Sequence, residues 1–263
     1  MNAYLKGKTV LITGASSGLG EKLAFYAAQS DANVILLARN EAKLAQISEQ
    51  IKKSFQVKAD YYHLDITDFK ELEQVANTIL VRHEIDALIN CAGFGLFETA
   101  ENTPFETVEA MFDTNVLGLI RFTQLFIPYF KQKKSGHIIQ IASQAAKIAT
   151  PKSSAYAATK FAVLGYSNAL RMELKGDNIK VTTVNPGPIA THFFDIADES
   201  GEYLKSVGFL VLKPEKVAEK TIRIIGKNRR EVNLPFLMNI GTRIYQVIPS
   251  VVEFFGRSAF MKK

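Results

Sequence analysis

Cysteine is almost absent from this chain of 263 residues, which contains only Cys91. A lone cysteine cannot form an internal disulfide, so we expect a reducing compartment and a cytoplasmic protein. The first residues lack the basic, apolar and small-residue pattern of a signal peptide. No uninterrupted apolar run approaches the ~20 residues that a membrane-spanning helix needs. We therefore expect no membrane span.

Metal-binding side chains are also few. The histidines do not have the spacing of a metal site, and one cysteine adds no set of soft ligands. The four histidines are His63, His83, His137 and His192. We therefore expect no metal. The Gly-x-Ser-x-Gly turn that presents the nucleophile of many Ser-His-Asp hydrolases is missing as well, which argues against that class.

Positive charge is unevenly distributed. The net charge is +6 and the pI about 9.2, but from Lys205 onward twelve Lys and Arg residues face four Glu residues. The rest of the chain is nearly neutral or slightly acidic, so we do not expect a nucleic acid partner. The excess lies in an apolar section, and residues 234–263 form an apolar, basic C-terminal segment. Two interpretations stay open: a solvated rim with a dimer surface, or weak peripheral contact with an anionic membrane.

Short apolar runs alternate with longer segments of helical periodicity. The runs predict strands near 9–13, 34–38, 57–64, 86–90, 137–142 and 180–185, and the intervening segments predict helices near 19–30, 41–53, 68–82, 104–133 and 154–174. This alternation is typical of a doubly wound parallel sheet in a three-layer α/β/α fold. No linker divides the chain, so we expect one domain over residues 1–263. The irregular, aromatic segment 187–214 is a candidate substrate lid.

A glycine-rich turn joins the first predicted strand to the first predicted helix. Glycines permit a sharp turn and a close approach of the backbone to a pyrophosphate, whose charge the helix N-terminus then meets. The turn therefore predicts dinucleotide binding. Its candidate cofactor residues are Gly14, Ser16, Ser17, Gly18, Leu19 and Gly20.

Tyr156 and Lys160 lie four residues apart in a predicted helix, which places both side chains on one face. A phenol has a pKa of about 10 in water, and a nearby ammonium favours the phenolate. Such a tyrosine can exchange a proton with an alcohol or alkoxide. Ser143 ends the fifth predicted strand, at the edge where ligands bind in open α/β sheets, and could orient the substrate oxygen.

The turn, the Tyr-x-x-x-Lys pair and the serine together resemble the short-chain dehydrogenase/reductase family. The similarity runs from about residue 7 to 191. It implies a Rossmann fold and a catalytic set of Asn115, Ser143, Tyr156 and Lys160, in which Asn115 supports a proton relay. By the same resemblance the other cofactor residues are Arg39, Asp65, Asn90, Gly93, Tyr156, Lys160, Pro186, Gly187, Ile189 and Thr191. Cys91 stands where the family has a second Asn.

The end of the second predicted strand bears on the choice of dinucleotide. Ala38 stands where an acid would bind the ribose of NAD, and Arg39 follows it. A guanidinium can hold a 2′-phosphate, so NADP (NADPH) is favoured. Ser17 departs from the second basic residue that many NADP-dependent relatives carry in the turn. Instead of contacting the cofactor, Asp65 could cap the N-terminus of the following helix, a role that Thr67 or Asp68 could also fill.

We therefore expect an NADP-dependent oxidoreductase that acts on a carbonyl or alcohol carbon. The resemblance implies a homodimer or homotetramer formed through the helices that carry Asn115 and Tyr156. Two other functions stay open: an NADP-binding redox-sensing module without turnover, and a membrane-docked reductase of lipid or steroid-type ketones. Five aromatic residues are candidates for an apolar substrate pocket: Phe94, Phe97, Phe193, Phe194 and Phe209.

Overall fold

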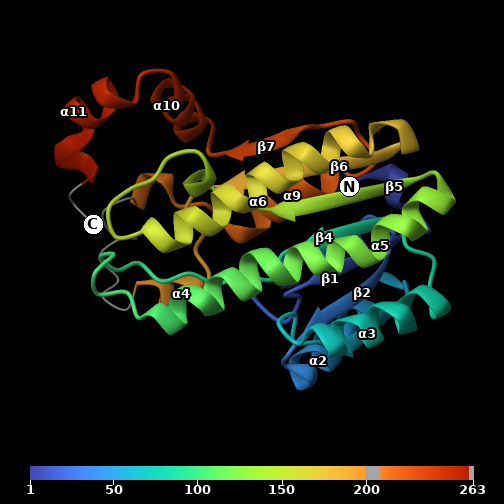
Figure 1. The fold of residues 1–263 in the computed structure, drawn as a ribbon. Helices are drawn as coiled ribbons and strands as arrows, with labels where there is room; N and C mark the ends of the chain where they lie inside the picture. The colour runs from blue at the N-terminus through green and yellow to red at the C-terminus, as the bar shows by residue number, and fades with distance from the viewer. Residues whose placement is uncertain (199–207, 261–263) are drawn as a thin grey trace.

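The computed structural model describes residues 1–198 and 208–260. Its centre is a parallel sheet with the strand order β3-β2-β1-β4-β5-β6-β7 (Figure 1). The strands are β1 Thr9–Thr13, β2 Asn33–Ala38, β3 Ala59–His63, β4 Ala87–Asn90, β5 Gly136–Ile141, β6 Ile179–Pro186 and β7 Glu231–Leu234. The winding direction reverses between β1 and β4, and such a reversal opens a crevice at the carboxyl ends of the strands.

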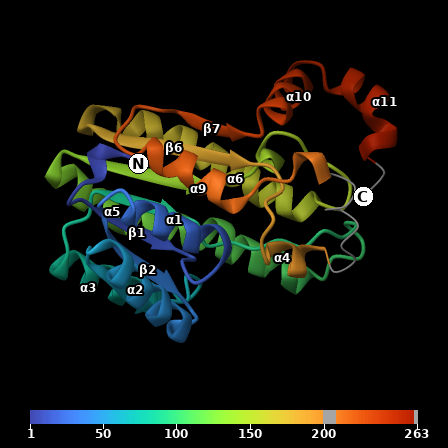
Figure 2. The same cartoon turned by 180° about the vertical axis from the view of Figure 1, so that it is seen from behind.

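Helices cover both faces of the sheet, which confirms the three-layer prediction. One face is covered by α1 Gly18–Ala28, α2 Glu41–Phe55 and α9 Pro214–Arg223 (Figure 2). The other is covered by α3 Phe69–Arg82, α5 Leu119–Lys133 and α6 Ser154–Glu173 (Figure 1). The fold is a single Rossmann-like α/β domain.

The continuous apolar runs follow from this double burial. In β1, Val10 and Ile12 pack in the core beneath α1, whereas Leu11 packs in the core on the opposite face. Residues that alternate in direction along a strand are all buried when both faces are covered. The run TVLIT is therefore apolar at every position between its two threonines.

The structure departs from the predicted elements at one helix and one strand, and it adds helices from residue 214 onward that no predicted range covered. The predicted helix 104–133 is interrupted: α4 Phe105–Phe112 leads into a π-helical turn, η2 Asp113–Gly118, before α5 begins. The strand β7 was not predicted, because its sequence EVNL is short and follows the charged run KNRR. Short connecting elements complete the described fold: η1 Ala3–Leu5, η3 Gln144–Ala146, η4 Lys175–Asp177, α7 Phe193–Ala197 and η5 Gly208–Leu210.

Two helices at the C-terminal end, α10 Phe236–Val247 and α11 Pro249–Phe260, project from the end of the domain at which the strands terminate (Figures 1 and 2). None of the helices in the described ranges is both long and apolar enough to cross a membrane. The predicted lid 187–214 includes α7 and η5, and its middle, residues 199–207, lies outside the described ranges.

Candidate active site

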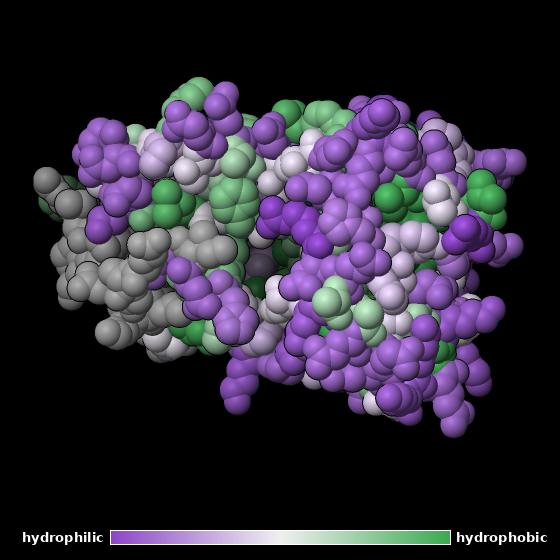
Figure 3. Space-filling model, turned by 90° about the horizontal axis from the view of Figure 1, so that it is seen from below, coloured by the Kyte–Doolittle hydropathy of each residue, from purple (hydrophilic) through white to green (hydrophobic). Residues whose placement is uncertain are grey.

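A cavity of about 890 Å³ lies at the carboxyl ends of the strands, at the position where the strand order reverses. The loops after β1, β2, β4, β5 and β6 contribute to its wall. Figure 3 shows a hollow near the middle of one face, with hydrophobic residues at its edge and hydrophilic residues over most of the remaining surface. The cavity joins the predicted cofactor residues and the predicted catalytic residues in one space.

In the glycine turn after β1, a side chain at Gly14 or Gly20 would disrupt the backbone. Gly14 has φ +68°, and a Cβ there would lie 2.8 Å from the Cα of Ala92. A Cβ on Gly20 would overlap the carbonyl oxygen of Gly14. Helix α1 begins at Gly18, and the side chain of its N-cap, Ser17, makes no capping hydrogen bond. The first N–H groups of α1 therefore border the cavity, where they can meet phosphate oxygens.

In the loops after β2 and β3, Arg39 is exposed and Asp65 is half-buried, and both line the cavity. Asp65 does not cap a helix, because Asp68 caps α3 by accepting hydrogen bonds from the backbone N–H groups of Lys70 and Glu71. Asp65 thus lies at the strand end without capping a helix.

The carboxylate of Asp65 is held in its charged form. Its Oδ1 accepts hydrogen bonds from the backbone N–H of Thr67 at 3.0 Å and from the Thr67 hydroxyl at 2.7 Å. Burial raises the pKa of Asp65, but these bonds and the nearby Arg39 and His63 outweigh that effect, so the pKa lies below its usual value. A negative charge therefore stands beside the Arg39 guanidinium.

The predicted catalytic residues Ser143, Tyr156 and Lys160 all line the cavity. Helix α6 carries Tyr156 and Lys160 one turn apart, and the Lys160 Nζ lies 5.7 Å from the centroid of the Tyr156 ring. Lys160 is 6% exposed, and its Nζ donates a hydrogen bond to the Ile141 carbonyl at 3.2 Å. Burial lowers the pKa of Lys160 from 10.5 to about 8.

Ser143 follows β5, at the start of η3, and lines the same cavity as Tyr156. Its Oγ accepts a hydrogen bond from the Ala145 N–H at 3.0 Å and lies 3.5 Å from the Pro186 carbonyl, to which it donates. The second bond is at the limit of hydrogen-bond length, so the hydroxyl proton can be redirected to a substrate oxygen at little cost. The serine thus has a fixed position, and its hydroxyl can change the acceptor to which it donates.

Asn115 lies behind the cavity and does not line it. It sits in the π-helical turn η2, where its Oδ1 accepts from the Phe94 N–H at 3.0 Å and its Nδ2 donates to the Phe94 carbonyl at 2.8 Å. Nδ2 also donates to the Thr159 hydroxyl at 3.2 Å. Asn115 therefore connects the strand-end loop at Phe94 to α6, next to Lys160, which is the position of a supporting residue.

Asn90 likewise lies behind the cavity wall. Its Nδ2 donates to the Thr123 hydroxyl and to Gln140 Oε1, each at 2.9 Å, so it supports the end of β4 from within the core. The neighbouring Cys91 lines the cavity, but burial raises the pKa of its thiol to about 12. It is a neutral packing residue, not an activated nucleophile.

Aromatic rings surround Tyr156. Its ring centroid lies 5.7 Å from that of Phe97 and 5.7 Å from that of Phe193. Phe94 and Phe194 also line the cavity, as predicted, whereas the side chain of Phe209 lies outside the described part of the chain. The space beside Tyr156 is therefore apolar.

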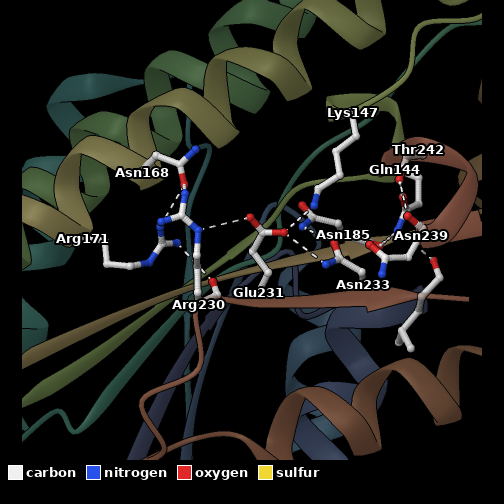
Figure 4. A network of polar contacts seen from close by, with 11 residues as sticks. Gln144, Lys147, Asn168, Arg171, Asn185, Arg230, Glu231, Asn233, Asn239 and Thr242 are labelled. Atoms are coloured by element: carbon white, nitrogen blue, oxygen red, sulfur yellow. Dashed lines mark hydrogen bonds and ion pairs between the residues drawn. The ribbon is translucent and has the colours of Figure 1, made fainter. Parts of the chain in front are cut away.

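A network of polar side chains holds the loop after Ser143 (Figure 4). Gln144 donates from Nε2 to the Asn185 carbonyl at 2.9 Å, and its Oε1 accepts from the Thr242 hydroxyl at 3.3 Å. Lys147, which is 6% exposed, forms an ion pair with Glu231 of β7. Through these contacts β7 and α10 fix the loop that carries the serine.

The cavity also contains residues that the sequence did not predict. Met238, from α10, lines it together with Ile148, Thr150 and Leu210. No motif marks Met238, Ile148 or Thr150, which reach the site through the packing of α10 and of the loop after Ser143, whereas Leu210 belongs to the predicted lid segment 187–214. Among the described residues no cluster of three or more His, Cys, Asp or Glu side chains could hold a metal.

Comparison with known proteins places this architecture in a family. A family model described as short chain dehydrogenase matches residues 8–200. The chain is 33% identical over 243 residues to dehydrogenase/reductase SDR family member 7B of Xenopus laevis, covering 88% of this chain and 74% of that protein. It is 32% identical over 227 residues to 3-ketodihydrosphingosine reductase of Bos taurus, covering 83% and 68%.

A solved structure shows the same fold with a bound nucleotide. An alcohol dehydrogenase from the archaeon Thermococcus sibiricus, complexed with 5-hydroxy-NADP, superposes with a TM-score of 0.78 at 25% identity. The superposition covers 87% of this chain and 96% of that one. Relatives of this kind bind a nicotinamide cofactor and act on alcohol or carbonyl groups. The chain is thus an oxidoreductase that belongs to the short-chain dehydrogenase/reductase family.

Proposed function

We propose that the protein transfers hydride between NADP(H) and a carbonyl or alcohol carbon, with Tyr156 as the proton donor or acceptor. One observation carries this proposal: Ser143, Tyr156 and Lys160 converge on the cavity whose other end is the glycine turn. The nucleotide and the reacting oxygen then share one space. A binding module without turnover would have no need of that arrangement.

The residues at the turn fit a dinucleotide. Gly14 and Gly20 allow a tightly packed turn that a Cβ at either position would disrupt, and the start of α1 offers N–H groups to the pyrophosphate. We assign the remaining contacts to Ser16, Ser17, Leu19, Asp65, Gly93, Ile189 and Thr191, which line the cavity. When bound, the nicotinamide supplies or accepts the hydride.

We assign each catalytic side chain a separate role in the proton transfer. In reduction, Tyr156 gives its phenolic proton to the oxygen on which negative charge develops, and Ser143 orients that oxygen by donating a hydrogen bond. Protonated Lys160 favours the phenolate that Tyr156 becomes and can hold a ribose hydroxyl. Asn115 keeps the loop at Phe94 and the helix α6 in register, and we assign it a supporting role in the proton relay.

NADP is the favoured form of the cofactor. Arg39 lies at the cavity edge, and Ala38, which precedes it, carries no carboxylate to repel a 2′-phosphate. Asp65 stands nearby but is engaged by Thr67, and it also balances the Arg39 charge. The 5-hydroxy-NADP of the archaeal relative supports the same choice.

We further infer an apolar substrate and a lid. The ring of Phe97 packs edge to face against those of Tyr156, Phe193 and Phe194, and the Phe97 N–H donates to the Ala197 carbonyl at 2.7 Å. The described parts of segment 187–214 thus cover the site, in keeping with a substrate lid. The bovine relative is named a reductase of 3-ketodihydrosphingosine, a keto compound, which supports a ketone as the substrate of this protein.

We also propose a homodimer or homotetramer formed through α4, η2 and α6. Large apolar side chains are exposed on these elements, as on a surface that a partner covers. They are Phe105, Leu117, Phe161 and Met172. The cytoplasmic location expected from the single cysteine stays a prediction.

A carbonyl panel tests the proposal. Purified protein is mixed with NADPH or NADH and a series of aliphatic and aromatic ketones, and the loss of reduced-cofactor absorbance is followed. We expect turnover of apolar ketones, faster with NADPH than with NADH. Tight binding of NADPH without turnover of any ketone would favour the redox-sensing module.

A further inference from the structure

Helix α10 exposes apolar side chains and buries polar ones, which is the reverse of the usual arrangement for a helix at the surface of a domain. Its outward face carries Leu237, Ile240 and Ile244, which are 63%, 41% and 46% exposed. Its inward face buries Asn239 and Thr242, which are 9% and 1% exposed. Spacings of three and four residues put the apolar side chains in one stripe, and such a stripe normally faces the core. Here it faces away from the domain.

Specific contacts fix this orientation. The Thr242 hydroxyl donates to Gln144 Oε1 at 3.3 Å, and Gln144 is itself anchored on the Asn185 carbonyl (Figure 4). On the same side, Met238 lines the cavity, and its Sδ would lie 2.9 Å from a Cβ on Gly187. Helix α10 therefore has one side on the substrate cavity and the opposite side, with the apolar stripe, outside the domain.

The stripe continues beyond α10. Ile248, between the two helices, and Val251, in α11, are 45% and 48% exposed, so exposed apolar side chains continue into the first turn of α11. We name the side chains of Leu237, Ile240, Ile244, Val247, Ile248 and Val251 the outer stripe. An apolar surface of this continuity on a projecting element is typical of a docking surface.

The sequence from the start of α10 to the C-terminus is basic. Residues 236–263 include Arg243, Arg257, Lys262 and Lys263, against one acid, Glu253. Arg243 is exposed, whereas Glu253 accepts a hydrogen bond from the Tyr245 hydroxyl at 2.9 Å. An apolar face with an exposed arginine, in a basic stretch of sequence, fits the surface of an anionic bilayer, where apolar side chains enter the headgroup boundary and cations meet lipid phosphates and carboxylates.

A second copy of the chain is a poorer match to the same surface. In a two-fold contact through the outer stripe, Arg243 of each copy would meet a surface that carries the same positive charge. The exposed apolar residues of α4 and α6 already provide a different surface for self-association. The charge complementarity therefore favours lipid.

We propose that α10 and α11 dock the protein on the surface of an anionic membrane through the outer stripe. We propose also that the cavity receives an apolar ketone from that membrane along the side of α10 that carries Met238. This second part rests on the proposed function, because it requires reduction of a ketone. The first part requires only binding.

Flotation with vesicles tests the docking. The full chain is mixed with vesicles of phosphatidylcholine alone, or of phosphatidylcholine and phosphatidylserine, and centrifuged through a density gradient. We expect the protein to float with the mixed vesicles, less with the neutral ones, and less at high salt. Leu237→Glu combined with Ile244→Glu should lower the bound fraction about tenfold or more, since it puts two anions in the stripe.

Two matched variants control this experiment. Val81→Glu, on α3, adds a charge at a position that is 87% exposed and far along the chain from the stripe, so it should float like the wild type. Arg243→Gln keeps the stripe and removes one charge, and should weaken binding to mixed vesicles about fivefold. If the double variant fails to fold, the binding of Arg243→Gln to mixed vesicles still tests the docking proposal.

The docking proposal is wrong if the wild type stays in the soluble fraction with mixed vesicles, or if the double variant floats as well as Val81→Glu. It is also wrong if sedimentation shows that the outer stripe joins two copies in solution, with the double variant monomeric.

Enzyme assays separate the two parts. A short, water-soluble ketone should be reduced equally by the wild type and the double variant, whereas a long-chain ketone embedded in mixed vesicles should be reduced more slowly by the variant alone. Flotation without reduction of any ketone would leave the docking intact and contradict the proposed function. Equal reduction of the embedded ketone by both proteins would contradict delivery from the membrane.

Discussion

At the scale of single residues, Arg39 is the side chain expected to choose between the two nicotinamide cofactors. It is exposed at the cavity edge, follows Ala38, and stands beside the charged Asp65. Its guanidinium can bind a 2′-phosphate through two charge-assisted hydrogen bonds. The loss of such contacts costs about 1.5–3 kcal/mol, which corresponds to about 10- to 100-fold in affinity.

Arg39→Ala should therefore weaken NADPH binding by about 10- to 100-fold and leave NADH binding within about threefold. Titration of cofactor fluorescence with both nucleotides measures this directly. An equal loss of affinity for NADPH and NADH would show that Arg39 does not contact the 2′-phosphate.

Lys160 carries a cost in stability that follows from its burial. Its folded pKa of about 8 lies below the ordinary 10.5, so between these pH values the unfolded chain binds more protons than the folded chain. The destabilisation is complete below about pH 8 and decreases as the pH rises toward 10.5. The difference between 10.5 and about 8 corresponds to a penalty of up to about 3 kcal/mol.

Lys160→Met should thus lose activity and yet, without cofactor, be more stable than the wild type at pH 7 by up to about 3 kcal/mol. The advantage should shrink as the pH is raised through 9 and 10. Urea unfolding at several pH values measures it. A variant less stable than the wild type throughout would mean that the Ile141 hydrogen bond outweighs burial of the charge.

At the scale of elements, the turn between β1 and α1 is held by contacts that only glycine permits. Gly20→Ala would push a methyl group against the Gly14 carbonyl, and the turn would open where it meets the pyrophosphate. We expect the variant to lose about 1–3 kcal/mol of stability and to bind NADPH more weakly. Thermal unfolding and cofactor titration measure the two effects.

A second glycine provides the comparison for Gly20. A Cβ on Gly176, in η4, would have nothing within 4 Å. Gly176 lies just before the amino end of β6, whereas the cavity lies at the carboxyl ends of the strands. Gly176→Ala should leave NADPH affinity unchanged. If it weakened binding as much as Gly20→Ala, the effect at Gly20 could not be assigned to the turn.

At the scale of the whole molecule, the exposed apolar side chains of α4 and α6 predict self-association. Phe105→Glu combined with Phe161→Glu would put charges on the proposed subunit surface and should convert an oligomer into a monomer. Sedimentation velocity measures the change, with Val81→Glu as the matched control on α3. A wild type that sediments as a monomer would contradict the proposed assembly.

The sequence predicted the layers and most of the site because each depends on local patterns. The run TVLIT, the glycines of the turn, and the spacing of Tyr156 and Lys160 each have a direct physical meaning, and the cavity joins them. The predictions for Asn90 and Asn115 were made from resemblance, and the structure places both behind the cavity wall.

Other features depend on contacts between distant segments. The strand β7 has no apolar run, and it pairs with β6 while its Glu231 binds Lys147. Met238 enters the cavity only because Thr242 and Gln144 hold α10 against the loop after Ser143. Such placements follow from the packing of the whole chain and leave no periodic signal in the sequence.

The measurement that tests the central claim most directly is the turnover of Tyr156→Phe with NADPH and the best ketone of the panel. The substitution keeps the ring among Phe97 and Phe193 and removes only the hydroxyl. We predict a kcat at least about 100-fold below the wild type, since the proton donor is lost, with NADPH affinity changed less than about threefold. A variant that keeps wild-type kcat would contradict the role of Tyr156 in proton transfer.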